Sequence, residues 1–169
     1  MLNIGSRTCR STSFSSATPE KGLAGMTSNA DDCRSVYDNW ASDYGKDVEK
    51  WGYDMPSRVA SLVARHLDPN KSPLRMLDAG AGDGLSGMAL RDMFPNSHLT
   101  AVDLSSKMID VAEKRGCYND LQILDLNQPP FSFQPETFDA ITCVGTMTYV
   151  DPAAGTLNEF CRLVKTTRP

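Results

Sequence analysis

A change of period after Pro73 constrains the fold of this chain more than any other feature. Four short apolar runs follow, and helix-length segments separate the first three of them. The expected strands are 74–77, 99–102, 121–124 and 138–144, and the expected helices between them are 85–94 and 105–115. Because strands joined through helices pair in parallel by right-handed crossovers, the alternation predicts an α/β fold with helices on both faces of a parallel sheet.

Helical patterns flank this alternation on both sides. An apolar stripe from Val36 to Tyr44 predicts one helix, and Pro56 opens a second that ends near Asp68. After a loop over 127–137 and the fourth strand, Asp151 and Pro152 are expected to cap a last helix. Its predicted apolar face consists of Leu157, Phe160, Cys161 and Val164.

Composition excludes several classes of protein. The chain has 169 residues, of which 40% are hydrophobic, and this suits a single domain. No apolar run approaches the roughly 20 residues that cross a bilayer, so no membrane span is expected. The net charge is −4 and no candidate helix carries a basic stripe, so nucleic acid is not an expected partner. A small nucleotide-like ligand stays open.

The first 30 residues differ from the rest in composition. They contain ten Ser or Thr residues and few apolar ones, which predicts a disordered tail before a domain over 31–169. The alternative is an organellar transit peptide, because Arg7 and Arg10 precede the first acidic residue, Glu20. A cytoplasmic protein is expected on the first interpretation and a mitochondrial one on the second. The five cysteines form no metal-binding spacing, so reduced thiols and no metal are expected.

The first strand ends in a glycine-rich turn. Asp78, Gly80, Gly82 and Gly84 alternate there, and glycine lets the backbone turn sharply and approach a ligand. Asp103 follows 25 positions after Asp78, at the end of the second strand, where a carboxylate can accept hydrogen bonds from both ribose hydroxyls. A strand, a glycine loop, a helix, a strand and an acid together predict a nucleoside site.

The same loop contains a competing pattern. Residues 82–87 match the dinucleotide fingerprint G-x-G-x-x-G, which keeps a nicotinamide-dependent oxidoreductase as an alternative. Starting the fingerprint at Gly82 leaves Asp78 and Gly80 within or just beyond an apolar strand, and starting it at Gly80 puts Leu85 where a small residue belongs. The arrangement therefore favours a ligand without a pyrophosphate, with Asp78 near a cationic amine.

On these motifs the sequence resembles the class I S-adenosylmethionine (SAM)-dependent methyltransferases, over residues 34–165. The matching segments are 78–84, 101–105, 124–126, 138–150 and 158–165, and the segment 36–44 with Gly52 and Tyr53 is similar to the Williams–Beuren region methyltransferase-like group. The resemblance implies a Rossmann-like sheet in the order 3-2-1-4, S-adenosylmethionine as cofactor and an unidentified small-molecule or protein acceptor. The implied cofactor-binding residues are Asp78, Gly80, Gly82, Gly84, Asp103, Leu104, Asp125 and Leu126.

Each of these residues also has a plain structural interpretation. Asp78, Asp103 and Asp125 could cap turns at strand ends, and the stripe of Tyr37, Trp40 and Tyr44 could face the core rather than a cofactor. Tyr149 and Asp151 are the candidates for a proton acceptor, but packing of the tyrosine and N-capping by the aspartate are preferred. The sequence therefore predicts no catalytic residue.

The family pattern would continue after Lys165 into a fifth strand and a hairpin, but four residues follow here. The expectation is an incomplete sheet whose fourth strand is an open, apolar edge that favours self-association. Weak cofactor binding and no methyl transfer by this chain follow from that expectation. A non-catalytic nucleoside-binding remnant is the third function class.

Overall fold

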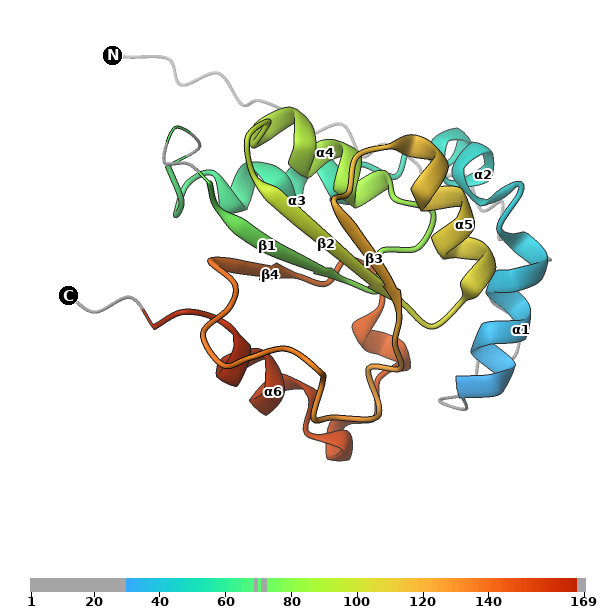
Figure 1. Ribbon diagram of the computed structural model, residues 1–169. Coiled ribbons are helices and arrows are strands. Elements are labelled where there is room, and N and C mark those ends of the chain that lie inside the picture. The colour runs from blue at the N-terminus through green and yellow to red at the C-terminus, as the bar shows by residue number, and fades with distance from the viewer. Residues whose placement is uncertain (1–29, 69, 71–72, 167–169) are drawn as a thin grey trace, which may run out of the picture.

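The sheet is built around its first strand, β1 (Arg75–Ala79), which pairs in parallel with β2 (His98–Asp103) and with β4 (Ala140–Thr142). β3 (Asp120–Ile123) pairs in parallel with the other side of β2. The strand order β3-β2-β1-β4 confirms the predicted α/β parallel sheet (Figure 1). The computed structural model describes residues 30–68, 70 and 73–166, so the predicted tail lies almost wholly outside the described residues.

Helices occupy both sides of the sheet, as predicted, with α3 and α4 on one side and α6 on the other in Figure 1. The helices are α1 (Ala30–Trp40), α2 (Tyr44–Lys50), α3 (Met55–Val63), α4 (Leu85–Met93), α5 (Ser106–Arg115) and α6 (Thr156–Leu163). Two short 3₁₀ helices, η1 (Met147–Tyr149) and η2 (Pro152–Ala154), separate β4 from α6.

Alternate residues of β1 contribute to two separate cores. Met76 packs in a cluster with Ala60 of α3 and Leu90 of α4, whereas the next residue, Leu77, packs in a cluster with Leu163 of α6. Successive side chains of a strand point to opposite faces, so this alternation places one core under each layer of helices. Both Met76 and Leu77 have no exposed surface, which makes β1 the centre of the molecule.

Several helix predictions are wrong in detail, and α3 ends at Val63 rather than near Asp68. The stripe from Val36 to Tyr44 belongs to two helices, since α1 ends at Trp40 and α2 begins at Tyr44. The predicted apolar face of α6 is wrong in part. Phe160 packs against the core, but Leu157 is 63% exposed and the buried positions are Thr156, Glu159 and Leu163. Glu159 is buried because its carboxylate accepts a hydrogen bond from the Phe131 backbone N–H and pairs with Arg162.

The fourth strand lies at an edge of the sheet, but one end of that edge is covered. Val164 forms an isolated parallel bridge with Phe138, and the Lys165 N–H donates to the Phe138 carbonyl at 2.8 Å. The chain leaving α6 therefore runs beside the start of the fourth apolar run. Over the described part of the chain, β4 itself pairs only with β1 in the sheet.

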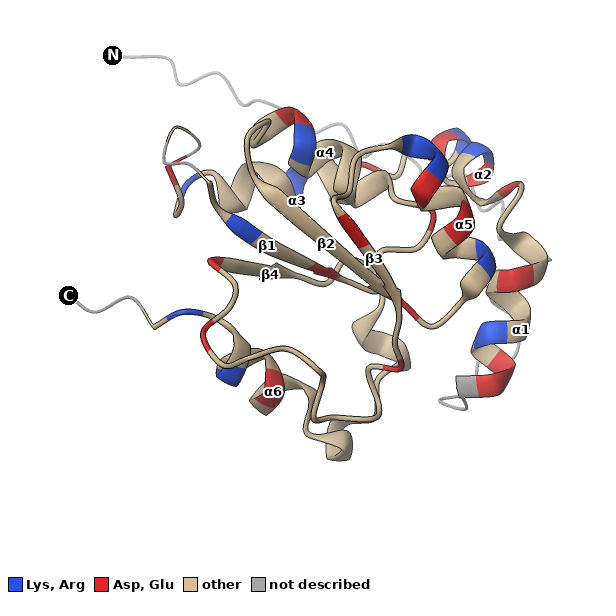
Figure 2. Ribbon diagram, in the orientation of Figure 1, with Lys and Arg blue, Asp and Glu red and all other residues tan. Residues whose placement is uncertain are grey.

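Basic side chains are spread over several elements of the ribbon, among acidic ones (Figure 2). Within residues 30–68, 70 and 73–166, no helix is both long enough and apolar enough to cross a bilayer. The same part of the chain contains no cluster of His, Cys, Asp and Glu side chains that could hold a metal ion.

Candidate functional site

A cleft of about 940 Å³, partly open to solvent, lies where the loops that follow β1, β2 and β3 meet. The carboxyl ends of parallel strands share one edge of a sheet, and ligands of open α/β folds bind in the crevice outside that edge. Six of the eight predicted site residues line the cleft. They are Gly80, Gly82, Asp103, Leu104, Asp125 and Leu126.

The glycine loop after β1 forms one wall of the cleft. Gly82 has φ of +54°, and a Cβ at this position would meet no atom within 4 Å. Gly80 has φ of +72°, and a Cβ there would lie 2.3 Å from the Thr146 hydroxyl oxygen, so this glycine admits the loop that follows β4. A left-handed backbone favours glycine at both positions. Only at Gly82 would a side chain enter the open cleft.

Asp103 lies at the end of β2, directly opposite the glycine loop. Its Oδ2 accepts a hydrogen bond from the Gly82 N–H at 2.8 Å, and its Oδ1 accepts one from the Ser105 N–H at 2.9 Å. Burial raises the pKa of the Asp103 carboxyl, and these backbone donors partly offset the rise. Each carboxylate oxygen can accept a second hydrogen bond, so the group suits a ligand with two neighbouring hydroxyls.

The loop after β3 contributes Asp125 and Leu126. Asp125 Oδ1 accepts from the Asn127 N–H at 2.8 Å, which is the turn-capping contact of its plain interpretation. Leu126 is buried, and its carbonyl accepts from the Thr156 hydroxyl at 2.6 Å. The Asn127 side chain then ties this loop to the next one, because its Oδ1 accepts from the Asp151 N–H at 2.7 Å.

The two other predicted residues, Asp78 and Gly84, do not line the cleft. Asp78 is 1% exposed. Its carboxylate accepts hydrogen bonds from three hydroxyls, those of Ser86 at 2.5 Å, Tyr118 at 2.6 Å and Thr142 at 3.0 Å. Burial raises the Asp78 pKa, and the three hydroxyls partly offset the rise. Asp78 therefore joins β1, α4, β4 and the segment that leads into β3.

Tyr118 was missed by sequence reasoning, although Gly87 carries a signal for it. A Cβ at Gly87 would lie 2.1 Å from the Tyr118 ring carbon Cζ, so α4 needs a glycine where this ring packs. The third glycine of the dinucleotide fingerprint thus has a packing role in this chain. Gly84 has a similar role, since its Cβ would approach Ala112 of α5 at 3.2 Å.

Tyrosines from three segments complete the cleft: Tyr37 and Tyr44 of the N-terminal helices, Tyr53 of the α2–α3 connection and Tyr149 of η1. The rings of Tyr37 and Tyr149 lie edge to face with centroids 6.0 Å apart, and their hydroxyls are hydrogen bonded. Burial raises the pKa of Tyr37 and of Tyr44, so both phenols are neutral at physiological pH. Trp40 is not in the lining, because its indole N–H donates to Asp47 at 3.0 Å.

The backbone of α2 packs against a partly buried ion pair between the glycine loop and α5. Asp83 is 2% exposed and forms an ion pair with Arg115 of α5, against which the backbone of α2 packs at Gly45. A Cβ at Gly45 would lie 2.7 Å from an Asp83 carboxylate oxygen, so α2 approaches this pair closely. Tyr44 directly precedes Gly45 in α2 and lines the cleft, as Tyr37 of α1 does.

Asp151 has the structural role preferred from the sequence. Its side chain accepts from the Ala153 N–H at 2.8 Å and so caps η2, although α6 itself begins later, at Thr156. Tyr149 packs on Tyr37, as its structural interpretation predicts, and also lines the cleft.

Known methyltransferases resemble this chain in sequence. It is 33% identical over 112 residues to human methyltransferase-like protein 27, covering 66% of this chain and 45% of that protein. It is 37% identical over 87 residues to a ubiquinone biosynthesis O-methyltransferase of Xylella fastidiosa, covering 49% of this chain and 35% of that protein. The chain thus spans less than half the length of either relative.

A solved structure shares the fold. The TehB-like SAM-dependent methyltransferase of Corynebacterium glutamicum superposes with a TM-score of 0.60 at 21% identity, over 77% of this chain and 67% of that one. Residues 76–167 match the family model described as a methyltransferase domain, which is more than half of the chain. The match starts inside β1 and includes the glycine loop, Asp103 and Asp125. The chain therefore belongs to the methyltransferase domain family.

Proposed function

We propose that the cleft binds S-adenosylmethionine and that the domain serves methyl transfer to an acceptor. The observation that carries the proposal is the pairing of Asp103 with Gly82, which places a half-buried carboxylate beside open space at the edge of the sheet. A nucleoside with two ribose hydroxyls supplies donors to such a carboxylate.

The lining residues fit the chemical groups of this cofactor. Asp103 would accept from the ribose hydroxyls, the backbone around Gly80 and Gly82 would face the amino acid portion, and the backbone of Leu126 beside Asp125 would face the adenine. The ammonium and sulfonium groups of the cofactor are cationic, and the neutral tyrosine rings around the cleft attract cations at their faces. The same rings exclude water when the cleft is filled.

Bound S-adenosylmethionine would supply an electrophilic methyl group on its sulfonium. The residues of this chain would then act by orienting the acceptor and excluding water rather than by forming a covalent intermediate. Tyr37, Tyr53 and Tyr149 border the space beside the glycine loop, so we propose that an acceptor lies against these rings. We assign no proton acceptor.

A thermal-shift comparison of S-adenosylmethionine, S-adenosylhomocysteine and NAD tests the proposal. A ligand at 100-fold excess over Kd adds about 2.7 kcal/mol to the free energy of unfolding. For a chain of this size that raises Tm by roughly 5 to 10 °C. The two adenosyl ligands are expected to give this rise and NAD none. A rise with NAD alone would overturn the assignment and favour the oxidoreductase alternative.

We also propose that a second copy of the chain pairs with β4 along its outer edge. Phe138 already pairs in parallel with Val164 on that side, and the backbone of β4 continues the same edge after Phe138. Apolar sheet edges without charge or proline pair readily with other chains.

A further inference from the structure

A continuous chain of hydrogen bonds leads from α1 to the glycine loop. The Ser105 hydroxyl donates to the Asp38 carboxylate, and the Ser105 N–H donates to Asp103 Oδ1 at 2.9 Å. The other Asp103 oxygen accepts from the Gly82 N–H at 2.8 Å. These hydrogen bonds join α1, the N-terminus of α5, the end of β2 and the glycine loop in series. Asp38 itself does not line the cleft.

Ser105 links Asp38 to Asp103, because it donates a hydrogen bond to each of them. It is 1% exposed, and as the N-cap of α5 its Oγ also accepts from the Met108 N–H at 3.1 Å. A hydroxyl has one proton, and donating it to Asp38 fixes the rotor so that a lone pair faces Met108. The Asp38 carboxylate also places negative charge at the N-terminus of α5, where it is favourable. Asp38 therefore fixes the position of the serine that holds Asp103.

We infer that Asp38 is a positioning residue for the cofactor site, holding Asp103 and, through it, the glycine loop in their binding arrangement by way of Ser105. The inference rests on the proposed function for the identity of the ligand. It assigns α1 a second role besides supplying Tyr37 to the cleft wall, because the adjacent residue sets the geometry of the ribose-binding acid.

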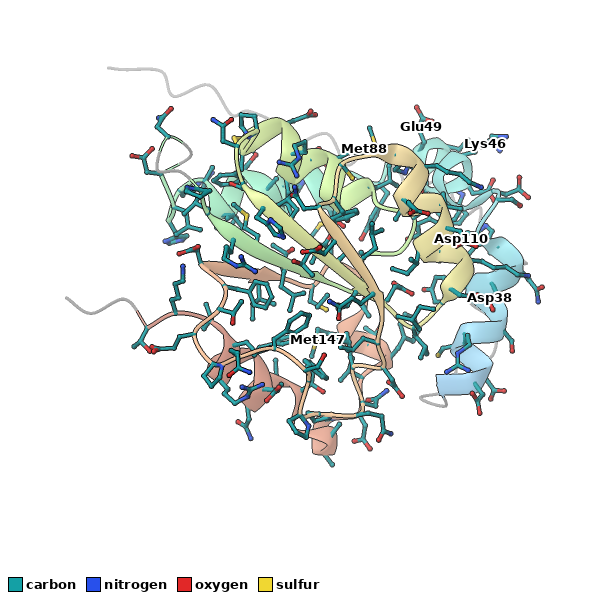
Figure 3. All side chains as sticks on the ribbon, in the orientation of Figure 1. Asp38, Lys46, Glu49, Met88, Asp110 and Met147 are labelled. Atoms are coloured by element: carbon teal, nitrogen blue, oxygen red, sulfur yellow. The ribbon has the colours of Figure 1, made fainter. Side chains whose placement is uncertain are left out.

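The first test needs no ligand. Amide hydrogen exchange, measured by NMR on the full 169-residue chain, compares Asp38→Ala with Asp110→Ala. Asp110 is an exposed carboxylate on α5 and serves as the matched control (Figure 3). The two amides that donate to Asp103, those of Gly82 and Ser105, are expected to exchange about tenfold faster in Asp38→Ala. The reason is that losing a hydrogen bond to a charged group changes an equilibrium constant by more than about tenfold. Amides of the buried β1 strand are expected to be unchanged.

The second test measures affinity for S-adenosylhomocysteine by calorimetry, well below Tm. Asp38→Ala is expected to raise Kd about tenfold, Asp38→Asn to restore most of the affinity because its amide oxygen still accepts from Ser105, and Asp110→Ala to leave Kd unchanged. In a Ser105→Ala background, Asp38→Ala is expected to have no further effect, because the path to Asp103 is already broken.

The outcomes separate this inference from the proposed function. Faster exchange at Met108 alone, or unchanged exchange at Gly82, would overturn the inference by confining Asp38 to the helix cap. Unchanged affinity in Asp38→Ala would overturn it as well. If the wild-type chain does not bind S-adenosylhomocysteine, the proposed function fails, and the exchange measurement still decides whether Asp38 positions Asp103.

Discussion

Asp78 and Asp103 come from neighbouring strands, and burial raises the pKa of both carboxyls, yet their partners differ. Asp78 accepts from three buried or half-buried side-chain hydroxyls, whereas Asp103 accepts from two backbone N–H groups at the edge of the cleft. The first arrangement joins elements together, and the second leaves acceptor capacity for a ligand. Asp78 therefore has a structural role, whereas the contacts of Asp103 suit the ligand-binding role proposed for it.

Substitution Asp103→Ala is expected to weaken S-adenosylhomocysteine binding by one to two decades. The lost charge-assisted hydrogen bonds are worth about 1.5 to 3 kcal/mol. Calorimetry measures the effect, with Asp92→Ala, an exposed carboxylate on α4, as control. Equal affinity of the two variants would remove Asp103 from the site.

Gly82→Val and Gly116→Val form a matched pair. Both glycines have positive φ, +54° and +66°, and a Cβ at either would meet nothing within 4 Å, so the backbone strain is similar. Only Gly82 lines the cleft, while Gly116 ends α5. Similar losses of Tm are expected, with loss of ligand binding confined to Gly82→Val. If both variants bind equally well, Gly82 serves the turn alone.

The pH dependence of binding follows from the raised pKa of Asp103. The ordinary value is 3.8, so the folded carboxyl takes up its proton at higher pH than the unfolded one. The affinity for S-adenosylhomocysteine is expected to fall as pH drops through this raised pKa, because the protonated group loses its charge and an acceptor. The contribution of the same group to the free energy of unfolding has the opposite sign, since the folded state binds the proton more tightly and this stabilisation is lost as pH rises through the same range.

Calorimetric titrations over a pH series check this dependence. Asp103→Asn is the control, because its side chain does not titrate. A wild-type Kd as flat with pH as that of the variant would contradict the assignment of Asp103.

At the scale of elements, α4 is fitted to the Tyr118 ring at Gly87. Gly87→Ala would place a methyl group 2.1 Å from Tyr118 Cζ, and such overpacking costs about 1 to 3 kcal/mol. Urea denaturation is expected to show that loss. The loss is expected to shrink in a Tyr118→Leu background, where the ring is gone. If the losses of the two single variants add in the double variant, Gly87 is required for a reason other than the Tyr118 ring.

The strands and the loops that line the cleft could be predicted from the sequence, because strand-sized apolar runs and glycine turns are local signals. The strand order followed only from the resemblance to a known family, since no local signal sets it. The break between α1 and α2 could not, since Trp40 and Tyr44 continue one apolar spacing across it. The buried face of α6 was missed because Glu159 is buried by its pairing with Arg162 and the Phe131 backbone, partners that no periodicity reveals. Asp38 was missed for the same reason, as its partner Ser105 lies 67 positions away.

For the molecule as a whole, the proposed self-association depends on the outer edge of β4. Asp139 donates its N–H inward to Arg75 and Phe138 donates its N–H outward to Leu163, so the alternation of a parallel ladder turns the Ala140 N–H outward. Light scattering is expected to find dimers or larger species. Ala140→Pro is expected to yield monomers, because it removes an outward donor and leaves the hydrogen bonds with β1. A monomeric wild-type chain would overturn the proposed edge pairing.

We propose that the loops at the carboxyl edge of the sheet form one adenosyl-binding site. An amide NMR titration of the chain with S-adenosylhomocysteine tests it most directly, because it locates the ligand as well as detecting it. Saturable shifts are predicted for the backbone amides of Gly82, Leu104 and Leu126, with none in α6. No saturable shift at these three positions, or shifts produced there by NAD and not by S-adenosylhomocysteine, would contradict the account.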